Sequence, residues 1–371
     1  MLRTLKKHLT NIPGWRTNRK IVVFESDDWG SIRMPSKACY EGLLKSGIRV
    51  DLSKYDSLDC LEKRTDLENL LEVLTGIQTQ SGSHPVFTLN TVMGNPDFEK
   101  IKQTNFQQFF FEHFFNSYKK YYGEYLEKLW KNGLENQLIL PQFHAREHLN
   151  SRLWLKDLQL NHKETRLAFD HGFFGLKTRT SSPFQNHYLS AYFVESPGEF
   201  EELKKTVNEG LHIFTNSFGM HSASFTACNY TWPVELEGFL AEKGIRIIQG
   251  QRGQIVPQLN GDGKKIKRHY TGQKNKHQQV YTVRNVLFEP YLSPEKDWAD
   301  LAMADISRAF FWKKPAIIST HRINYVSNMS TKNKDTGLRN LEKLLITLIK
   351  RHPEVEFMTS VQLGNLINPY K

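Results

Sequence analysis

Two neighbouring carboxylates follow an apolar run near the start of the chain. The β-branched run Ile21–Phe24 predicts a strand, and the letters ESDDWG, which contain Asp27 and Asp28, come directly after it. Barrels of alternating strands and helices place their active sites at the carboxyl ends of the strands. Adjacent carboxylates repel each other, and a divalent cation would compensate that repulsion. Asp27 and Asp28 are therefore candidates for chemistry, although a simple turn would explain the same letters.

Two histidines follow a second predicted strand, Leu138–Pro141. His144 and His148 are four positions apart, so on a helix they would project from one face about one turn apart. Imidazoles at that separation can share a metal ion. If a barrel brings them next to Asp28, one carboxylate and two histidines leave open positions for water. That composition is typical of a catalytic, hydrolytic metal site rather than a structural one.

A third histidine, His321, comes directly after the apolar run Ala316–Ser319. A single histidine is usually structural, but its place at a strand end, like that of the other two clusters, favours function. Residues 144–148 also match the H-x-x-E-H motif of one class of metallopeptidases. That class carries the motif within a helix, whereas here it follows a predicted strand, so a metallopeptidase is the less favoured alternative.

The elements that must position these residues alternate along the whole chain. Strands are predicted at residues 21–24, 86–91, 138–141, 212–217, 245–249, 280–288, 316–319 and 355–357, and helices at 65–76, 233–244, 297–311 and 337–351. Such alternation indicates a mainly parallel sheet with crossover helices. Seven or eight units fit one (β/α) barrel domain over residues 1–371 better than two domains.

Two segments interrupt this alternation. Residues 98–135 contain twelve aromatic residues, several of them at steps of about four, which predicts an aromatic stripe on one helical face. A helical insertion packed on the barrel is the favoured interpretation, and a lid whose rings stack on a sugar is the alternative. Residues 261–279 are strongly basic and predict an exposed loop or hairpin.

The net charge of +11 comes from two places. Residues 1–20 hold six Lys or Arg and no acid, and residues 261–280 hold six and one Asp, so the remaining chain is balanced at 38 of each sign. Nucleic-acid binding, which needs a basic face, is therefore not favoured, although phosphate binding by these two segments stays open.

Membrane insertion and a disulfide scaffold are also not favoured. No apolar run reaches the roughly 18 residues of a membrane span. Three cysteines, Cys39, Cys60 and Cys228, are too few and too scattered for a disulfide framework. The opening letters MLRTLKKHLT lack the apolar core of a secretory signal. These features predict a cytoplasmic setting.

The order of the clusters resembles the polysaccharide deacetylase superfamily, also known by NodB homology and as carbohydrate esterase family 4. A strand followed by two aspartates, a His-x-x-x-His pattern and a late strand followed by histidine occur in that order. The resemblance spans roughly residues 20–365 and ends in HPEVEFMTSVQLGNLI, which is similar to the family's last strand and helix. It implies a distorted (β/α) barrel of about seven strands with helical insertions.

The resemblance also implies a role for each candidate residue. Asp27 matches the catalytic base and His321 the catalytic acid. Asp28, His144 and His148 match the metal ligands, which implies a divalent metal ion, expected to be zinc. The metal would polarise the acetyl carbonyl and bind the attacking water, and the histidine would protonate the leaving group.

Two motifs depart from the pattern of the family. Residues 293–298 keep only Asp297 and Trp298 of the family's Asp-x-x-Asp-Trp motif. The family's third motif, Arg-x-Pro-aromatic, corresponds to the letters SFTACNY, in which Thr226 stands in place of Arg and Cys228 in place of Pro. The family's Arg orients the base. Arg284 or Arg322 could supply the missing cation, and the sequence leaves the choice open.

The expected function is that of a metal-dependent hydrolase that removes an acetyl group from an N- or O-acetylated saccharide. Trp29, Tyr230 and Trp232 are expected to stack on the sugar, a backbone N–H near Tyr230 to assist the oxyanion, and Arg284 to lie in the substrate site. The alternative within the same fold is a non-catalytic barrel that binds saccharide or phosphate through its basic segments.

Overall fold

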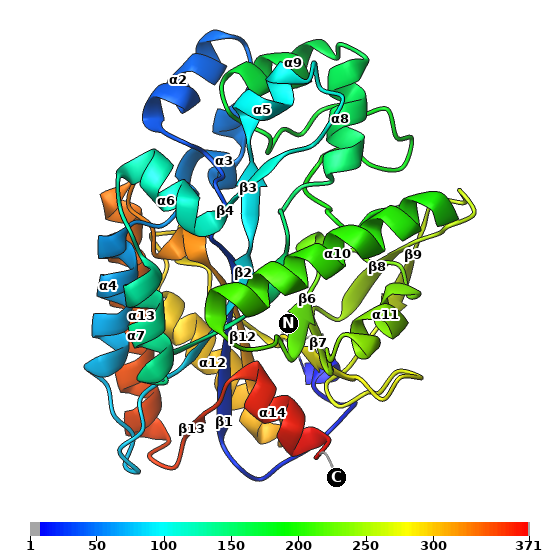
Figure 1. Cartoon of the computed structure of the whole chain (residues 1–371). Helices are drawn as coiled ribbons and strands as arrows, with labels where there is room; N and C mark the ends of the chain where they lie inside the picture. Colours follow the sequence, from blue (N-terminus) through cyan, green and yellow to red (C-terminus); the bar gives the residue numbers. More distant parts are fainter. Residues whose placement is uncertain (1–7, 370–371) are drawn as a thin grey trace.

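A curled parallel sheet runs through the middle of the computed structural model, which describes residues 8–369 (Figure 1). The strands on its main path are β1 Ile21–Trp29, β2 Phe87–Val92, β5 Ile139–Ala145, β6 Ser224–Thr226, β7 Ile247–Gly250, β10 Val280–Val283, β11 Val286–Leu287 and β12 Ala316–His321. Their order is β10-β7-β6-β5-β2-β1-β12-β11, and β13 (Glu356–Phe357) pairs with β1. All pairings in this sheet are parallel.

The two ends of the sheet are joined by the chain itself. β10 and β11 lie at opposite ends of the strand order, yet only Arg284 and Asn285 separate them in sequence. The backbone N–H of Arg284 donates to Gly250 on one end, and that of Asn285 donates to Ile317 on the other. The predicted distorted (β/α) barrel is therefore confirmed, and Arg284 lies at its seam.

Alternate residues of β1 face two different apolar layers, as the two-residue period of a strand requires. Val22 and Phe24 belong to the large core beneath the surrounding helices. Ile21 and Val23 form a smaller cluster with Ile317 of β12 and with α14 (Ser360–Ile367). α14 packs against β1, β7 and β10 and closes the lower end of the barrel in Figure 1.

Longer helices flank the barrel. They are α4 Arg64–Thr75, α10 Pro197–Phe218, α11 Leu236–Glu242, α12 Trp298–Phe311 and α13 Thr331–Arg351. α12 and α13 pack on each other, α4 packs on α13, and α10 crosses β5 (Figure 1). Within residues 8–369, no helix combines the length and the apolar character needed to cross a membrane.

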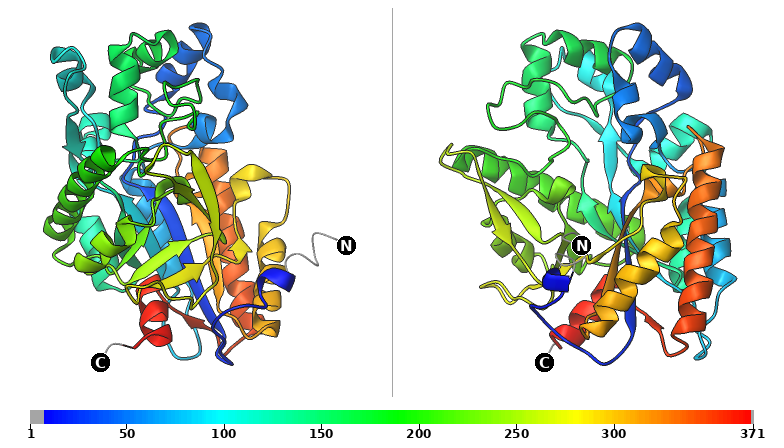
Figure 2. Two further views of the ribbon diagram at one scale, coloured as in Figure 1. Left: turned by 90° about the vertical axis from the view of Figure 1, so that its right-hand side faces the viewer. Right: turned by 180° about the vertical axis from the view of Figure 1, so that it is seen from behind.

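Shorter elements gather beyond the carboxyl ends of the strands. They are α2 Lys37–Lys45, the 3₁₀ turn η1 Val50–Leu52, α3 Lys54–Leu58, α8 Ser151–Gln159 and α9 Lys163–Asp170, with further 3₁₀ turns η2 Cys228–Tyr230, η3 Pro290–Leu292 and η4 Arg322–Asn324. Figure 2 shows from two further sides that α2, α8 and α9 lie together above the strand ends. Of these elements, η1, α3, η2 and η3 contribute residues to the wall of the candidate site.

The first predicted interruption consists of several short elements, and the second takes part in a hairpin, one of its two predicted forms. Residues 98–135 form α5 (Phe98–Gln103), β4 (Phe111–His113), α6 (Phe114–Tyr122) and α7 (Glu127–Glu135), and β4 pairs with β3 (Gly94–Pro96). Phe114 and Tyr118 are buried, and Phe114 packs edge-on against Trp130, which favours the packed insertion over the lid. Residues 261–279 contribute β9 (Lys264–Arg268) to an antiparallel hairpin with β8 (Gly253–Pro257).

One predicted strand is wrong, and one strand of the main sheet was not predicted. Residues 212–217 belong to α10, because Leu211 and Phe214 face the core at helical spacing while His212 is exposed. β6 was not predicted, because it has only three residues. Residues 1–7, part of the basic N-terminal segment, lie outside the described residues.

Candidate metal centre and acid–base pair

Asp27 and Asp28 both line one cavity at the carboxyl end of β1, although neighbours in a regular strand point to opposite faces. The pairing of β1 with β2 shifts register between Ser26 and Trp29, and Asp28 has a φ of 76°. A bulge of this kind turns an extra side chain toward one face, and strained backbone of this type is concentrated at functional sites. The local geometry therefore presents two carboxylates to the same cavity.

His144 and His148 reach the same cavity from β5 and the loop after it. The two histidines do not share a helix, because residues 146–149 form bends. The register of β2 and β5 shifts next to His144, and the two imidazole rings nevertheless lie 5.1 Å apart. His144 Nδ1 lies 2.8 Å from the carbonyl oxygen of Thr226, which orients the ring and leaves Nε2 toward Asp28.

The spacing of the three predicted ligands fits a metal ion. Asp28 Oδ1 lies 3.4 Å from His144 Nε2 and 3.2 Å from His148 Nε2. A tetrahedron with bonds of about 2.0 Å, as in zinc sites with nitrogen and oxygen ligands, has edges of about 3.3 Å. His148 Nδ1 has no hydrogen-bond partner in the described part of the chain. The donors present therefore suit a divalent cation.

Charge at these donors also favours a cation. Burial opposes ionisation of Asp28, but His148 and His144 outweigh it and lower its pKa well below the usual range. Burial lowers the pKa of His144, yet Cys228 and Asp28 raise it well above the usual value. The carboxylate and the thiol therefore stabilise positive charge at this cluster, which either a proton on an imidazole or a metal ion can supply.

Cys228 is a fourth donor that the sequence did not single out as a ligand. Its Sγ lies 3.9 Å from His144 Nε2, and donor atoms of Cys228, His144 and His148 all lie within 4.8 Å of one another. Burial raises the pKa of this thiol, but His144 and His148 lower it to about 7. A thiolate beside two imidazoles is a donor set that zinc favours.

Asp27 is held by a guanidinium that reaches across the barrel from its seam. Arg284 Nη1 and Nη2 donate to the two oxygens of Asp27 at 2.6 and 2.7 Å, and Nε donates to Glu25 at 2.7 Å. Asn90 donates to Asp27 Oδ1 at 2.7 Å. Burial raises the pKa of Asp27, but Arg284 outweighs it, and the pKa falls to about 2.

Of the two arginines that the sequence left open, Arg284 is the one that bonds to Asp27. Its side chain is buried and does not line the cavity of Asp27, so it positions a carboxylate rather than contacting a ligand. Arg322, the other candidate, bonds to Asp59 and Glu62 instead.

His321 stands opposite Asp27 in the register of β12 and β1. Its Nε2 lies 3.7 Å from Asp27 Oδ2, and its Nδ1 bonds to Glu289 Oε1 at 2.5 Å. Burial lowers the pKa of His321, but Glu289 outweighs it, and the pKa rises to about 9. An ionised carboxylate and a protonated imidazole therefore face the same cavity.

This cavity has a volume of about 670 Å³ and has three tyrosines in its wall, Tyr55, Tyr230 and Tyr291. Tyr230 lines the cavity, and its own backbone N–H donates to Ala227, so the predicted oxyanion donor near Tyr230 would have to be another N–H. Trp29 and Trp232 are at most 1% exposed and do not line the cavity. Neither indole face is therefore available to a sugar, contrary to expectation.

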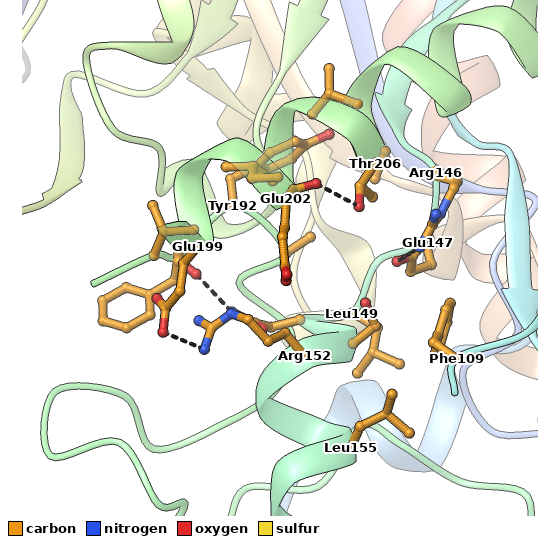
Figure 3. A pocket seen from close by; sticks show the side chains of 18 of the residues that line it. Phe109, Arg146, Glu147, Leu149, Arg152, Leu155, Tyr192, Glu199, Glu202 and Thr206 are labelled. Carbon is orange, nitrogen blue, oxygen red and sulfur yellow. Dashed lines mark hydrogen bonds and ion pairs between the residues drawn. The ribbon is translucent and has the colours of Figure 1, made fainter. Parts of the chain in front are cut away.

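Glu147 points away from the metal donors. It bonds to Arg146 within a different cavity, of about 450 Å³, lined by residues of α8 and α10 (Figure 3). The metallopeptidase motif requires a helix and a glutamate next to the metal, and this structure has neither at residues 144–148.

Sequence reasoning missed Glu289, Tyr55 and the ligand position of Cys228. Glu289 follows β11 at a strand end, which is the one signal that could have identified it. Tyr55, whose hydroxyl donates to Asp28 Oδ2 at 3.1 Å, lies in α3 without any pattern that marks it.

No protein-family model and no curated protein matches the chain. Solved structures that align over nearly all of it include a protein assigned as a polysaccharide deacetylase from Mycobacterium smegmatis, at 9% identity and a TM-score of 0.42, covering 96% of this chain and 92% of that chain. PuuE allantoinase aligns at 10% identity and 0.44, covering 97% and 95%. A GH57 branching enzyme from Thermococcus kodakaraensis aligns at 10% and 0.45, covering 96% and 72%. Polysaccharide deacetylases are thus among the structural neighbours, while the reaction has to be inferred from this chain's own side chains.

Proposed function

We propose that the protein is a metal-dependent hydrolase that removes an acetyl group from an N- or O-acetylated saccharide. One observation carries the proposal: an ionised carboxylate, a protonated imidazole and three converging metal donors line one cavity. The saccharide as substrate follows from the sequence resemblance, and the tyrosines in the wall supply ring faces that suit a sugar.

Asp28, His144 and His148 would hold the metal, with Cys228 next to them. When bound, a divalent cation supplies Lewis acidity toward the acetyl carbonyl and lowers the pKa of water. Zinc is the proposed metal, because two imidazoles, a carboxylate and a thiol suit it better than they suit magnesium or calcium.

Asp27 accepts the proton of the attacking water through an oxygen that Arg284 holds in place. His321 donates a proton from Nε2 to the leaving amine or alcohol, while Glu289 fixes its other nitrogen. His321 Nε2 and Asp27 Oδ2 are 3.7 Å apart, so the proton returns from Asp27 to His321 between steps through a bridging water or after a small side-chain movement.

Metal analysis of the purified protein alongside acetate release from a panel of N- and O-acetylated saccharides tests the proposal. We expect about one zinc per chain and acetate release from at least one sugar. His148→Ala should lose both, whereas His221→Ala, a change at an exposed histidine outside the cavity, should keep both. Bound metal without acetate release from the whole panel would favour the non-catalytic binding barrel.

A further inference from the structure

Arg33 lines the same cavity as the metal donors, and its guanidinium is largely unbonded. Its side chain is only 6% exposed. Neither Nε nor Nη1 has a hydrogen-bond partner among residues 8–369. A buried charge without hydrogen bonds is costly, so such a group calls for a partner that binds to it.

The nearest carboxylates do not supply those bonds. Asp59 Oδ2 lies 3.7 Å from Arg33 Nε, but both oxygens of Asp59 already accept hydrogen bonds from Arg322. Asp56 also lines the cavity, where burial raises its pKa and Arg33 opposes that rise. These charges balance Arg33 partly and leave donors of its guanidinium without acceptors.

A single tyrosine separates Arg33 from the reacting groups. The guanidinium carbon lies 5.1 Å from the ring centroid of Tyr55. The hydroxyl of the same tyrosine donates to the metal ligand Asp28, and its ring meets His321 edge-on at 5.7 Å. A molecule the size of one sugar could therefore reach both the acetyl-cleaving groups and Arg33.

Two lysines extend this cationic side of the cavity toward solvent. Lys54 and Lys177 are exposed and line the same cavity. Exposed cations at a cavity mouth attract anions by long-range electrostatics, whereas a buried guanidinium binds them through directed hydrogen bonds.

We infer that Arg33 binds an anionic group, a carboxylate or a phosphate, carried by the acetylated saccharide. The planar fork of the guanidinium matches two oxygens of either group. The statement that this molecule is acetylated rests on the proposed function, whereas anion binding at Arg33 does not.

Binding of simple anions to the metal-loaded protein tests the inference directly. Calorimetry with inorganic phosphate, glucuronate and neutral glucose should show an affinity for at least one of the two anions that glucose lacks. Arg33→Gln should weaken that affinity at least tenfold. Arg49→Gln, which removes an exposed arginine paired with Asp51 outside the cavity, should change it less than twofold. The phosphate and glucuronate arms separate the two sources of negative charge.

Kinetics provide a second readout if acetate release is found. With N-acetylglucosamine and its 6-phosphate, or an acetylated uronic acid, Arg33→Gln should raise KM for the charged substrate at least tenfold more than for the neutral one. If Arg33→Gln fails to fold, Arg33→Lys keeps the charge without the fork and should still weaken anion binding by about threefold.

The outcomes separate this inference from the proposed function. The role of Arg33 would be overturned if Arg33→Gln raised KM equally for neutral and charged sugars. It would also be overturned if Arg33→Gln left the anion affinity unchanged because the metal alone binds the anion. Anion binding that depends on Arg33 in a protein that releases no acetate would overturn the deacetylase proposal and leave this inference standing.

Discussion

Two buried arginines, Arg284 and Arg322, each bind a pair of carboxylates, and only one of the two clusters belongs to the candidate site. Arg284 bonds to Glu25 and Asp27. Arg322 bonds to Asp59 and Glu62 and also donates to the carbonyl of Ser31. The chemistry of the two clusters is nearly the same, so the difference lies in where the carboxylates point.

Asp27 lines the cavity, whereas Asp59 and Glu62 do not. Glu62 instead accepts from the backbone of Gly30 and from the hydroxyl of Tyr118, so its cluster ties the segment after β1 to α6. The comparison teaches that a buried ion pair by itself does not mark a catalytic site. What sets the Asp27 cluster apart is an ionised oxygen that faces a cavity beside the imidazole of His321.

The largest expected effect comes from removing the carboxylate that faces the cavity. Asp27→Asn should lower kcat by about 10³-fold with metal still bound, because the proton acceptor is lost. Metal content and single-turnover acetate release measure the two properties separately.

Glu62→Gln is the matched change in the other cluster. It should lower the thermal midpoint and leave kcat within about threefold, since its carboxylate contacts no cavity group. A comparable loss of kcat in both variants would erase the distinction between the clusters, and full activity in Asp27→Asn would remove Asp27 as the base.

The arginines themselves give a paired test of the same comparison. Arg284→Met and Arg322→Met should each lose about 3–5 kcal/mol of unfolding free energy, because each leaves two buried carboxylates without their counter-ion. Only Arg284→Met should also lose about 10²-fold in kcat, through a misplaced base.

The pH profile distinguishes positioning by Arg284 from a merely structural role. Arg284 lowers the pKa of Asp27 to about 2 against the effect of burial. Without the guanidinium that pKa rises, so the carboxylate is protonated, and activity is lost, at a higher pH than in the wild type. An unshifted acid limb in Arg284→Met would contradict the positioning role.

The strand ends that carry Asp27, His144 and His321 could be predicted from sequence, because each residue lies at the end of an apolar run. Parallel strands in a curled sheet bring such ends together. The arginine that holds Asp27 could not be predicted, because it depends on tertiary geometry. The seam between β10 and β11 carries Arg284 across the barrel, and no sequence pattern distinguishes Arg284 from Arg322 as the partner of Asp27.

The two tryptophans expected to stack on a sugar are buried, which is why the structure does not support that expectation. Trp29 and Trp232 are adjacent to site residues in sequence, but Trp29 bonds to Ser26 and Trp232 to Glu237 within the core. The histidine pair needed no helix, because a bulge in β5 and a loop gave the same proximity.

A smaller effect is expected at Cys228, which belongs to neither arginine cluster. Cys228→Ser should weaken zinc binding by about tenfold, since a hydroxyl is a poorer ligand than a thiolate, and should narrow the preference for zinc over manganese. Competition with a chromophoric chelator measures both affinities. Unchanged zinc affinity in this variant would exclude Cys228 from the ligand set.

The smallest expected change is a shift in the alkaline limb of the pH–activity profile, which depends on His321, the residue that faces Asp27. His321 works as a proton donor only while protonated, so activity falls as pH rises through its pKa of about 9. The charge of a bound metal lowers that pKa, so the limb should lie at or below pH 9.

Glu289 is the group that raises this pKa against the effect of burial, so Glu289→Gln must lower it. The alkaline limb should then move about one unit toward lower pH, with kcat on the neutral plateau changed far less than in Asp27→Asn. Asn324, whose side chain donates to the other oxygen of Glu289, provides the graded control. Asn324→Ala should shift the limb in the same direction as Glu289→Gln by a smaller amount, because the carboxylate stays but is held less firmly. A limb that stays in place in Glu289→Gln would mean that His321 is not the proton donor, and that the carboxylate facing the cavity acts without it.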